Sequence, residues 1–204
     1  MRNKGALTKP LTLAIDWHDL MYYGDPKAEG IVGAMPKNGS CHAYRFATAS
    51  VLLNRQRLTL AVVPMFDRSA LWHVKRLLMC IAELGLKVKL LLFDRGYYSI
   101  DLIRYLEGCG LKYIIHIPWH GKPLEAGVDR LHTTTTCKKR KSKQATFRLL
   151  SMRQHEKLLI FATNTAFKPR KLKKTFRKRW GIETSYRMIG LFLALYRFSA
   201  MLDY

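Results

Sequence analysis

The sequence predicts an α/β fold built on one mixed β-sheet flanked by helices. Three strand-like apolar runs come first, at residues 11–16, 42–53 and 57–63. Two amphipathic helical patterns then alternate with two further strand-like runs, at residues 87–93 and 112–117. Antiparallel strands followed by alternating helices and strands indicate a mixed sheet, and such sheets bind ligands at the carboxyl ends of their strands.

The first 63 residues predict a buried strand, a loop and a hairpin, in that order. Residues 11–16 are a short apolar run that Asp16 closes, so we expect a buried strand. Glycines, prolines and an Asn-Gly pair make residues 22–40 a predicted loop rich in turns. Only three polar residues separate residues 42–53 from residues 57–63, which predicts a hairpin.

The middle of the chain predicts two helices, each preceded by a serine N-cap. The first helix covers residues 69–84, with an apolar stripe at helical spacing and Ser69 as its cap. A strand follows at residues 87–93 and carries Asp94 at its end. Ser99 caps the second helix, which we expect to stop at the glycines after residue 107.

Residues 120–153 differ in character, with four consecutive threonines and a run of lysines and arginines. We predict a basic insertion at 119–165 that contains strands near 144–151 and 157–163. The core domain would then comprise residues 1–118 and 166–204, with a final helix starting near Thr175.

The charge balance excludes several classes of protein. The 204 residues include 36 Lys and Arg against 14 Asp and Glu, which gives a net charge of +22 and a pI near 10.2. A surface of this charge repels itself unless a polyanion is close, so nucleic acid is the first candidate partner. No stretch reaches 18 apolar residues and no signal peptide is present, so we expect no membrane partner. The four scattered cysteines fit a reducing cytoplasm.

Three acidic residues suggest a metal site in this cationic protein. Asp16 and Asp94 each end an apolar run, and Glu183 lies far downstream in a basic stretch that predicts a helix. If the two strands are parallel neighbours, their carboxylates face one point. Magnesium prefers oxygen ligands, and two ions about 3.5–4 Å apart can activate an attacking oxygen and stabilise a leaving one.

The predicted last helix places polar and aromatic groups around Glu183. At 100° per residue, four residues lie within about 40° of Glu183, and two aromatic residues flank that face. These six residues are Phe176, Arg179, Trp180, Tyr186, Arg187 and Gly190. The arginines could fork onto phosphates, and the aromatic rings could stack on bases.

Simpler interpretations stay open for each of these residues. An aspartate at a strand end is often a turn or cap residue. Arg179, Glu183 and Arg187 also have the spacing of exposed i,i+4 ion pairs. His18 and Asp19 are alternative ligands near Asp16. A pair formed by His116 and His120 is disfavoured, because the intervening proline prevents a shared helical face.

Three blocks of the sequence resemble the DDE transposases of prokaryotic insertion sequences. The first is Ala14-Ile15-Asp16-Trp17-His18-Asp19, followed by Tyr22-Tyr23-Gly24. The second runs from Leu92 through Asp94-Arg95-Gly96-Tyr97 to Ser99, and the third from Arg179-Trp180-Gly181-Ile182-Glu183 to Arg187. The closest group marks its last helix with a Tyr-x2-Arg-x3-Glu-x6-Lys signature. The similar region covers roughly residues 10–190.

This resemblance implies a ribonuclease-H-like mixed sheet with a strand-containing insertion before the last helix. It implies that Asp16, Asp94 and Glu183 are catalytic and hold two magnesium or manganese ions. It also implies cleavage at transposon ends, 3′-hydroxyl strand transfer into target DNA, a dimer in the synaptic complex, and a cytoplasmic, nucleoid-associated protein. We expect Arg95, Arg179 and Arg187 to contact DNA phosphates, and Trp119 to stack on a base.

The chain also departs from the family pattern. Phe176 falls at the signature tyrosine and lacks its hydroxyl, and Gly190 falls at the lysine, for which Arg187 could substitute. The chain begins near the first strand and ends soon after the Glu183 helix, which suggests truncation. Two alternatives therefore stay open: an inactive remnant that binds nucleic acid by charge, and a simple ribonuclease-H-like nuclease.

Overall fold

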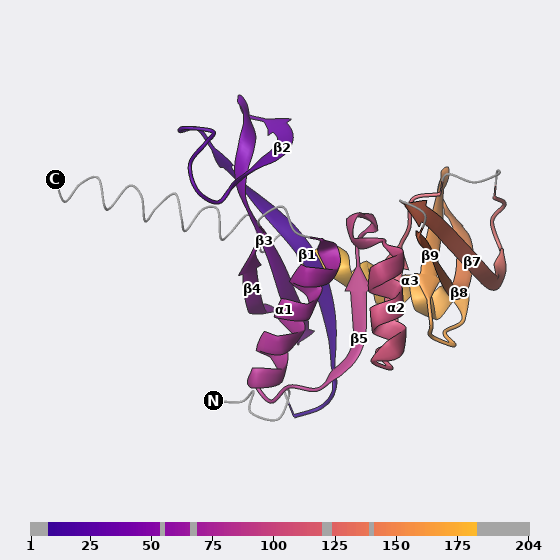
Figure 1. Ribbon diagram of the computed structural model, residues 1–204. Helices are drawn as coiled ribbons and strands as arrows, with labels where there is room; N and C mark the ends of the chain where they lie inside the picture. The colour runs from indigo at the N-terminus through magenta and orange to yellow at the C-terminus, as the bar shows by residue number, and fades with distance from the viewer. Residues whose placement is uncertain (1–7, 54–55, 66–68, 120–123, 139–140, 183–204) are drawn as a thin grey trace.

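The computed structural model describes residues 8–53, 56–65, 69–119, 124–138 and 141–182 (Figure 1). The strands are β1 (Leu11–Tyr22), β2 (Ile31–Lys37), β3 (Ser40–Leu53), β4 (Gln56–Pro64), β5 (Val88–Phe93), β6 (Tyr113–His116), β7 (Asp129–Lys138), β8 (Lys141–Gln154) and β9 (Lys157–Thr163). The helices are α1 (Ala70–Glu83), α2 (Ile100–Gly108) and α3 (Pro169–Phe176), with short 3-10 helices η1 (Arg95–Tyr97) and η2 (Arg177–Ile182).

In this part of the chain the strands form one nine-stranded sheet in the order β2-β3-β1-β5-β6-β9-β8-β7, and β4 also pairs with β3. The β1–β5 and β5–β6 pairs are parallel, and the other pairs are antiparallel. Helices α1 and α2 pack on one face of the sheet and α3 packs on the other (Figure 1). The predicted α/β fold with a mixed sheet flanked by helices is therefore confirmed.

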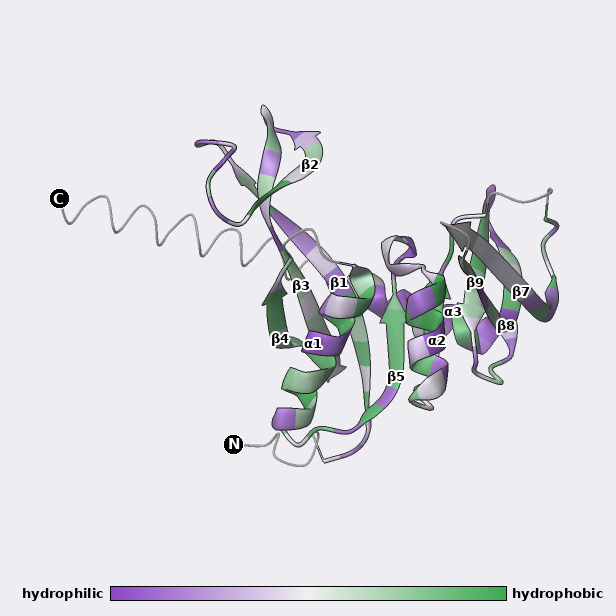
Figure 2. Ribbon diagram, in the orientation of Figure 1, coloured by the Kyte–Doolittle hydropathy of each residue, from purple (hydrophilic) through white to green (hydrophobic). Residues whose placement is uncertain are grey.

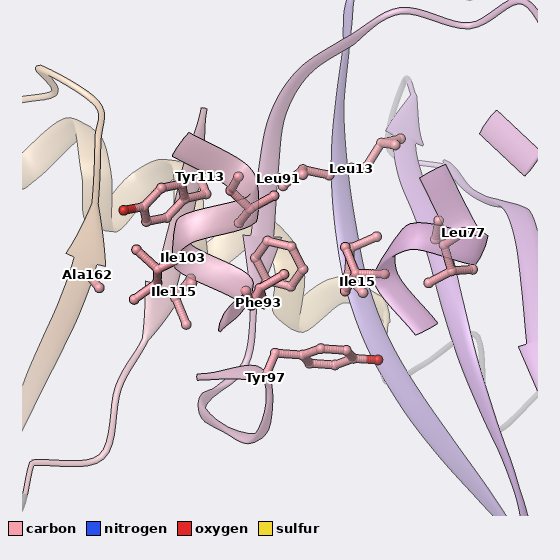
Figure 3. Close-up of a cluster of buried hydrophobic side chains, with 14 of the residues drawn as sticks. Leu13, Ile15, Leu77, Leu91, Phe93, Tyr97, Ile103, Tyr113, Ile115 and Ala162 are labelled. Carbon is pink, nitrogen blue, oxygen red and sulfur yellow. The ribbon is translucent and has the colours of Figure 1, made fainter. Parts of the chain in front are cut away.

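The central strands are apolar on both faces because helices cover both faces. Strand β5 is hydrophobic over most of its length (Figure 2). Ile15 and Phe93 pack toward α1 and α2, beside Leu77 and Ile103 (Figure 3). On the other face, a second cluster joins the sheet to α3. Its members are Ala14, Leu90, Leu92, Ile114, Leu150, Phe161, Leu172 and Phe176.

The first two helices begin at the predicted N-caps. The Ser69 side chain accepts a hydrogen bond from the Trp72 N–H, and the Ser99 side chain accepts one from the Leu102 N–H. Each cap satisfies one of the free N–H groups of a first helical turn. Gly85, with φ +68°, takes the left-handed conformation just past α1.

The N-terminal strands differ from the prediction in two ways. Strand β1 does not end at Asp16 but continues to Tyr22, because its second half pairs with β3 from Asp16 opposite Thr48 to Tyr22 opposite His42. A strand, β2, forms inside the predicted loop and pairs with the start of β3. Both extensions depend on cross-strand partners that are remote in sequence.

The predicted basic insertion lies in the same sheet as the core. Strands β8 and β9 match two predicted strands, whereas β7 was not predicted. Strand β9 pairs antiparallel with β6, with His116 opposite Phe161. The segment 119–165 therefore extends the central sheet, and its status as a separate domain stays a prediction.

The last described helix begins earlier than predicted. Helix α3 starts at Pro169 rather than near Thr175, and a 3-10 helix replaces α-helical geometry from Arg177. Proline suits the first position of a helix because its missing N–H would have no partner there. None of the helices in the described part of the chain is long and apolar enough to cross a membrane.

Candidate metal centre at the sheet edge

Three polar residues lie side by side where the parallel pairing of β1, β5 and β6 ends. In the β1–β5 pair Ile15 lies opposite Phe93, and in the β5–β6 pair Phe93 lies opposite Ile115. The two acid-bearing strands are therefore parallel neighbours, which is the condition under which their carboxylates were expected to face one point. The residues that come next on the three strands are Asp16, Asp94 and His116.

The two carboxylates lie on the α3 side of the sheet. Side chains alternate between the faces of a strand. Ile15 and Phe93 belong to the cluster under α1 and α2, so the next residues, Asp16 and Asp94, turn toward the other face. Asp19 falls on the opposite face from Asp16, and its carboxylate pairs with Arg45, with Nε–Oδ1 at 2.6 Å and Nη2–Oδ2 at 2.8 Å.

Arg179, in η2 just after α3, joins the two carboxylates. Its Nη1 donates to Oδ2 of Asp16 at 2.7 Å, and its Nη2 lies 3.5 Å from Oδ1 of Asp94. The Arg179 side chain is 6% exposed, against 14% for Asp16 and 38% for Asp94. Its Nε is buried and has no hydrogen-bond partner among the described residues. The sheet edge therefore already gathers two anionic groups around one buried cation.

The surroundings of Asp94 favour its ionised form. The imidazole of His116, with Nδ1 3.8 Å from Oδ1, is the largest cause that lowers the Asp94 pKa. Burial opposes this effect, while the charge of Arg179 and the backbone N–H of Arg95 add to it. The pKa of Asp94 is lowered to about 2, so this carboxylate is negative at neutral pH.

A close contact between η1 and β1 lies next to the two acids in sequence. Gly96 lies against the ring of Trp17, the residue next to Asp16. A Cβ at Gly96 would stand 1.9 Å from Cη2 of Trp17, so only glycine fits here. The buried ring of Tyr97 packs beneath, with its centroid 5.0 Å from that of Trp17.

The other predicted site residues lie in different environments. Phe176 is buried against Phe161, with ring centroids 4.9 Å apart, and Arg95 is exposed beside Asp94. Trp119 is partly buried and packs against β7, with its ring centroid 5.3 Å from that of His132. Three predicted residues, Glu183, Tyr186 and Arg187, lie outside the described residues, and for Trp180 only the backbone is described.

Sequence reasoning gave no role at this edge to His116. The sequence signal was present, because His116 ends the strand that follows the Asp94 strand and is parallel to it. The sequence placed His116 only in a disfavoured pair with His120, and His120 lies outside the described residues.

The residues present suit a hard cation. Two carboxylates approach one positive group, and carboxylate oxygens are the ligands that magnesium and manganese prefer. Among the described residues no group of three or more His, Cys, Asp or Glu side chains is close enough to form a metal site. A third carboxylate would have to come from outside them, where Glu183 lies.

Comparison with known proteins gives two kinds of match. The family model described as "Transposase DDE domain" matches residues 9–195. A cryo-EM structure of the piggyBac transposase synaptic complex with hairpin DNA has a TM-score of 0.59 and 13% identity, and the match covers 88% of this chain and 40% of that chain. This similarity confirms the ribonuclease-H-like fold.

Other comparisons add little. A crystal structure of an endonuclease V from Bacillus subtilis has 12% identity over 83% of this chain and 70% of that chain. Its TM-score of 0.35 is too low to support any conclusion about fold. No curated protein matches the chain. The chain spans less than half the length of the piggyBac transposase chain.

Proposed function

Because the chain belongs to the transposase DDE domain family, we propose that it is the catalytic domain of a metal-dependent DNA transposase. The reaction would cut DNA strands at transposon ends and join the freed 3′-hydroxyl to target DNA. One observation carries this proposal: carboxylates from two neighbouring parallel strands approach the same buried cation at the sheet edge. The synaptic complex would contain two copies of the protein.

The proposed roles follow from position and charge. Asp16 and Asp94 would hold magnesium or manganese, with Glu183 as the third carboxylate. Two such ions, when bound, would activate the attacking oxygen and stabilise the leaving oxygen. Arg179 pairs with both aspartates and offsets one of their two negative charges, so a divalent cation must compete with its guanidinium. Once displaced, Arg179 could bind a DNA phosphate, as could the exposed Arg95.

Plasmid nicking tests the proposal. We expect the protein to nick supercoiled plasmid in magnesium and not in EDTA. Asp94→Asn keeps the size of the side chain but removes its charge, so it should lower the nicking rate by at least about 100-fold, which corresponds to about 2.7 kcal/mol.

Asp101→Asn is a matched control for this test. Asp101 is an exposed aspartate on α2 that pairs with Lys143, and its substitution should leave nicking unchanged. Equal activity of Asp94→Asn and the wild type would remove Asp94 from the mechanism. A pre-cut oligonucleotide with a free 3′ end separates strand transfer from simple hydrolysis.

A charge-only DNA-binding remnant is a second candidate function. The pairing of both aspartates by Arg179 favours it, because a guanidinium already occupies the position between the two carboxylates that a metal ion would take. Calorimetric titration with manganese distinguishes the two functions. A transposase core should give saturable heat that Asp94→Asn reduces, whereas a remnant should give none.

A further inference from the structure

The outer face of α3 and the start of η2 carry a stripe of five cationic side chains. Their positions are spaced i, i+3, i+4, i+7 and i+8, which is one face of a helix. Four are exposed and Lys173 is half-buried, and together they line a shallow hollow of about 710 Å³. This cationic stripe consists of Arg170, Lys173, Lys174, Arg177 and Lys178.

The protein does not balance this charge locally. No acidic residue occurs between Glu156 and Glu183, and the first turn of α3 has none. Among the described residues, no ion pair or hydrogen bond involves a side chain of the stripe. Like charges four residues apart destabilise a helix by a few tenths of a kcal/mol per pair. An external polyanion would relieve this repulsion.

The stripe faces away from the acid pair. The buried face of this segment consists of Leu172, Phe176 and Arg179, which pack toward the sheet and its two aspartates. At 100° per residue, the stripe centres roughly opposite Leu172. A DNA strand at Asp16 and Asp94 would therefore lie on the other side of α3 from the stripe.

We propose that the cationic stripe binds the sugar-phosphate backbone of a second stretch of duplex DNA, separate from the strand at Asp16 and Asp94. The inference rests on DNA being the partner, as in the proposed function. Eight residues of helix rise span about 12 Å. Phosphates follow one another about every 3.4 Å of axis along each strand, so the stripe can neutralise roughly three or four of them.

A lipid surface fits the stripe less well than DNA. Helices that bind membranes present apolar residues to the lipid beside their cations. Here the apolar residues Leu172 and Phe176 are buried against the sheet. Lys171 and Thr175, which flank the stripe on the same segment, are polar. The surface therefore offers charge and hydrogen bonds but no hydrophobic anchor.

The test compares two variants that each lose two arginines and three lysines to glutamine. The stripe variant changes its five residues, and the control variant changes five exposed cations elsewhere in the described structure. The control positions are Lys87, Lys89, Arg104, Lys112 and Arg153. Affinity for a 30-base-pair duplex of arbitrary sequence is measured in EDTA at several KCl concentrations.

We expect the slope of log K against log salt to become shallower by about 3 for the stripe variant, because each lost phosphate contact removes about 0.9. The control variant should change by less than about 1. A difference between the variants smaller than about 2 would overturn the proposal. So would a stripe variant that binds DNA as the control does but no longer binds vesicles containing phosphatidylserine.

Lysine protection gives a second readout on the unmodified protein. Bound duplex should slow acetylation of Lys173, Lys174 and Lys178 but not of Lys87 or Lys112. Equal protection of the stripe lysines and of Lys87 and Lys112 would also overturn the proposal. This result would hold even if the stripe variant failed to fold, because the measurement uses the unmodified protein. Because neither measurement involves cleavage, their outcome is independent of the nicking test with Asp94→Asn.

Discussion

At the scale of single residues, Arg179 offsets part of the repulsion between Asp16 and Asp94 in the folded protein. Asp16 and Asp94 are like charges held close to the same group, and Asp16 is mostly buried. Without a cation between them, the aspartates would repel each other and one would be favoured to take up a proton. Arg179 supplies that cation within the chain. The same arrangement means that a metal ion must replace Arg179.

Replacing Arg179 tests whether it stabilises the acid pair and whether a metal ion must replace it. Arg179→Met keeps the length and apolar stem but removes the charge, so it should lower the free energy of unfolding by about 3 kcal/mol. This value lies at the low end of the range for breaking a buried ion pair, because water reaches the partly exposed Asp94. Added manganese should then raise the melting temperature of Arg179→Met more than that of the wild type, because no guanidinium competes.

Arg177→Met is the matched control, since Arg177 is exposed two residues earlier in η2. It should change stability by less than about 0.5 kcal/mol and leave the manganese response unaltered. A manganese response of Arg179→Met no larger than that of the wild type would show that the aspartates do not bind the ion.

At the scale of elements, the contact between Gly96 and Trp17 holds η1 against β1. This contact joins the loop after Asp94 to the residue after Asp16. Gly96→Ala would bring Cβ far inside contact distance of the indole, so Trp17 or the loop must move. We expect a loss of about 1–3 kcal/mol in the free energy of unfolding, measured by urea denaturation.

Gly108→Ala provides the control for that substitution. Gly108 ends α2, and a Cβ there would meet nothing within 4 Å. Alanine should be neutral or stabilise the helix by up to about 1 kcal/mol. The double variant Gly96→Ala, Trp17→Leu should recover part of the lost stability if the indole causes the clash. No recovery would place the strain elsewhere in the loop.

Local signals explain which elements the sequence predicts well. The caps Ser69 and Ser99 and the apolar run of β5 act over a few residues, and the structure has each where the sequence predicts it. The second half of β1 was missed, because its polar residues are stabilised by β3 pairing and by the Asp19–Arg45 ion pair. The sequence did not predict the start of α3, because the helix is mostly basic and has only two buried apolar residues, Leu172 and Phe176.

The same distinction applies to the candidate site. The apolar runs before Asp16 and Asp94 predicted two buried strands, but only the structure shows that these strands are parallel neighbours. The contact with Arg179 could not be assigned, because it depends on how α3 and η2 pack against the sheet. His116 could have been assigned, because it ends a strand-like run as Asp94 does. Arg179 has the spacing of an exposed ion pair, and only the packing shows that it is buried.

At the scale of the whole molecule, net charge opposes folding. A formal charge of +22 on 204 residues repels itself in the compact state. Within the described ranges, three ion pairs with partly exposed partners act in the other direction, Asp19–Arg45, Asp101–Lys143 and Asp129–Arg148. Such pairs contribute about 0–1 kcal/mol each and weaken with salt. Because cations far outnumber these pairs, repulsion should dominate.

Salt should therefore stabilise the folded protein. Raising sodium chloride from 10 to 150 mM shortens the screening length from about 30 to about 8 Å, which removes most long-range repulsion. A relief of about 1–2 kcal/mol corresponds to an increase of about 2–8 °C in melting temperature for a chain of this length. The stripe variant, at a formal charge of +17 after losing five of the 22 net charges, should respond less. A melting temperature that falls with salt in the absence of DNA would show that local ion pairs outweigh the repulsion.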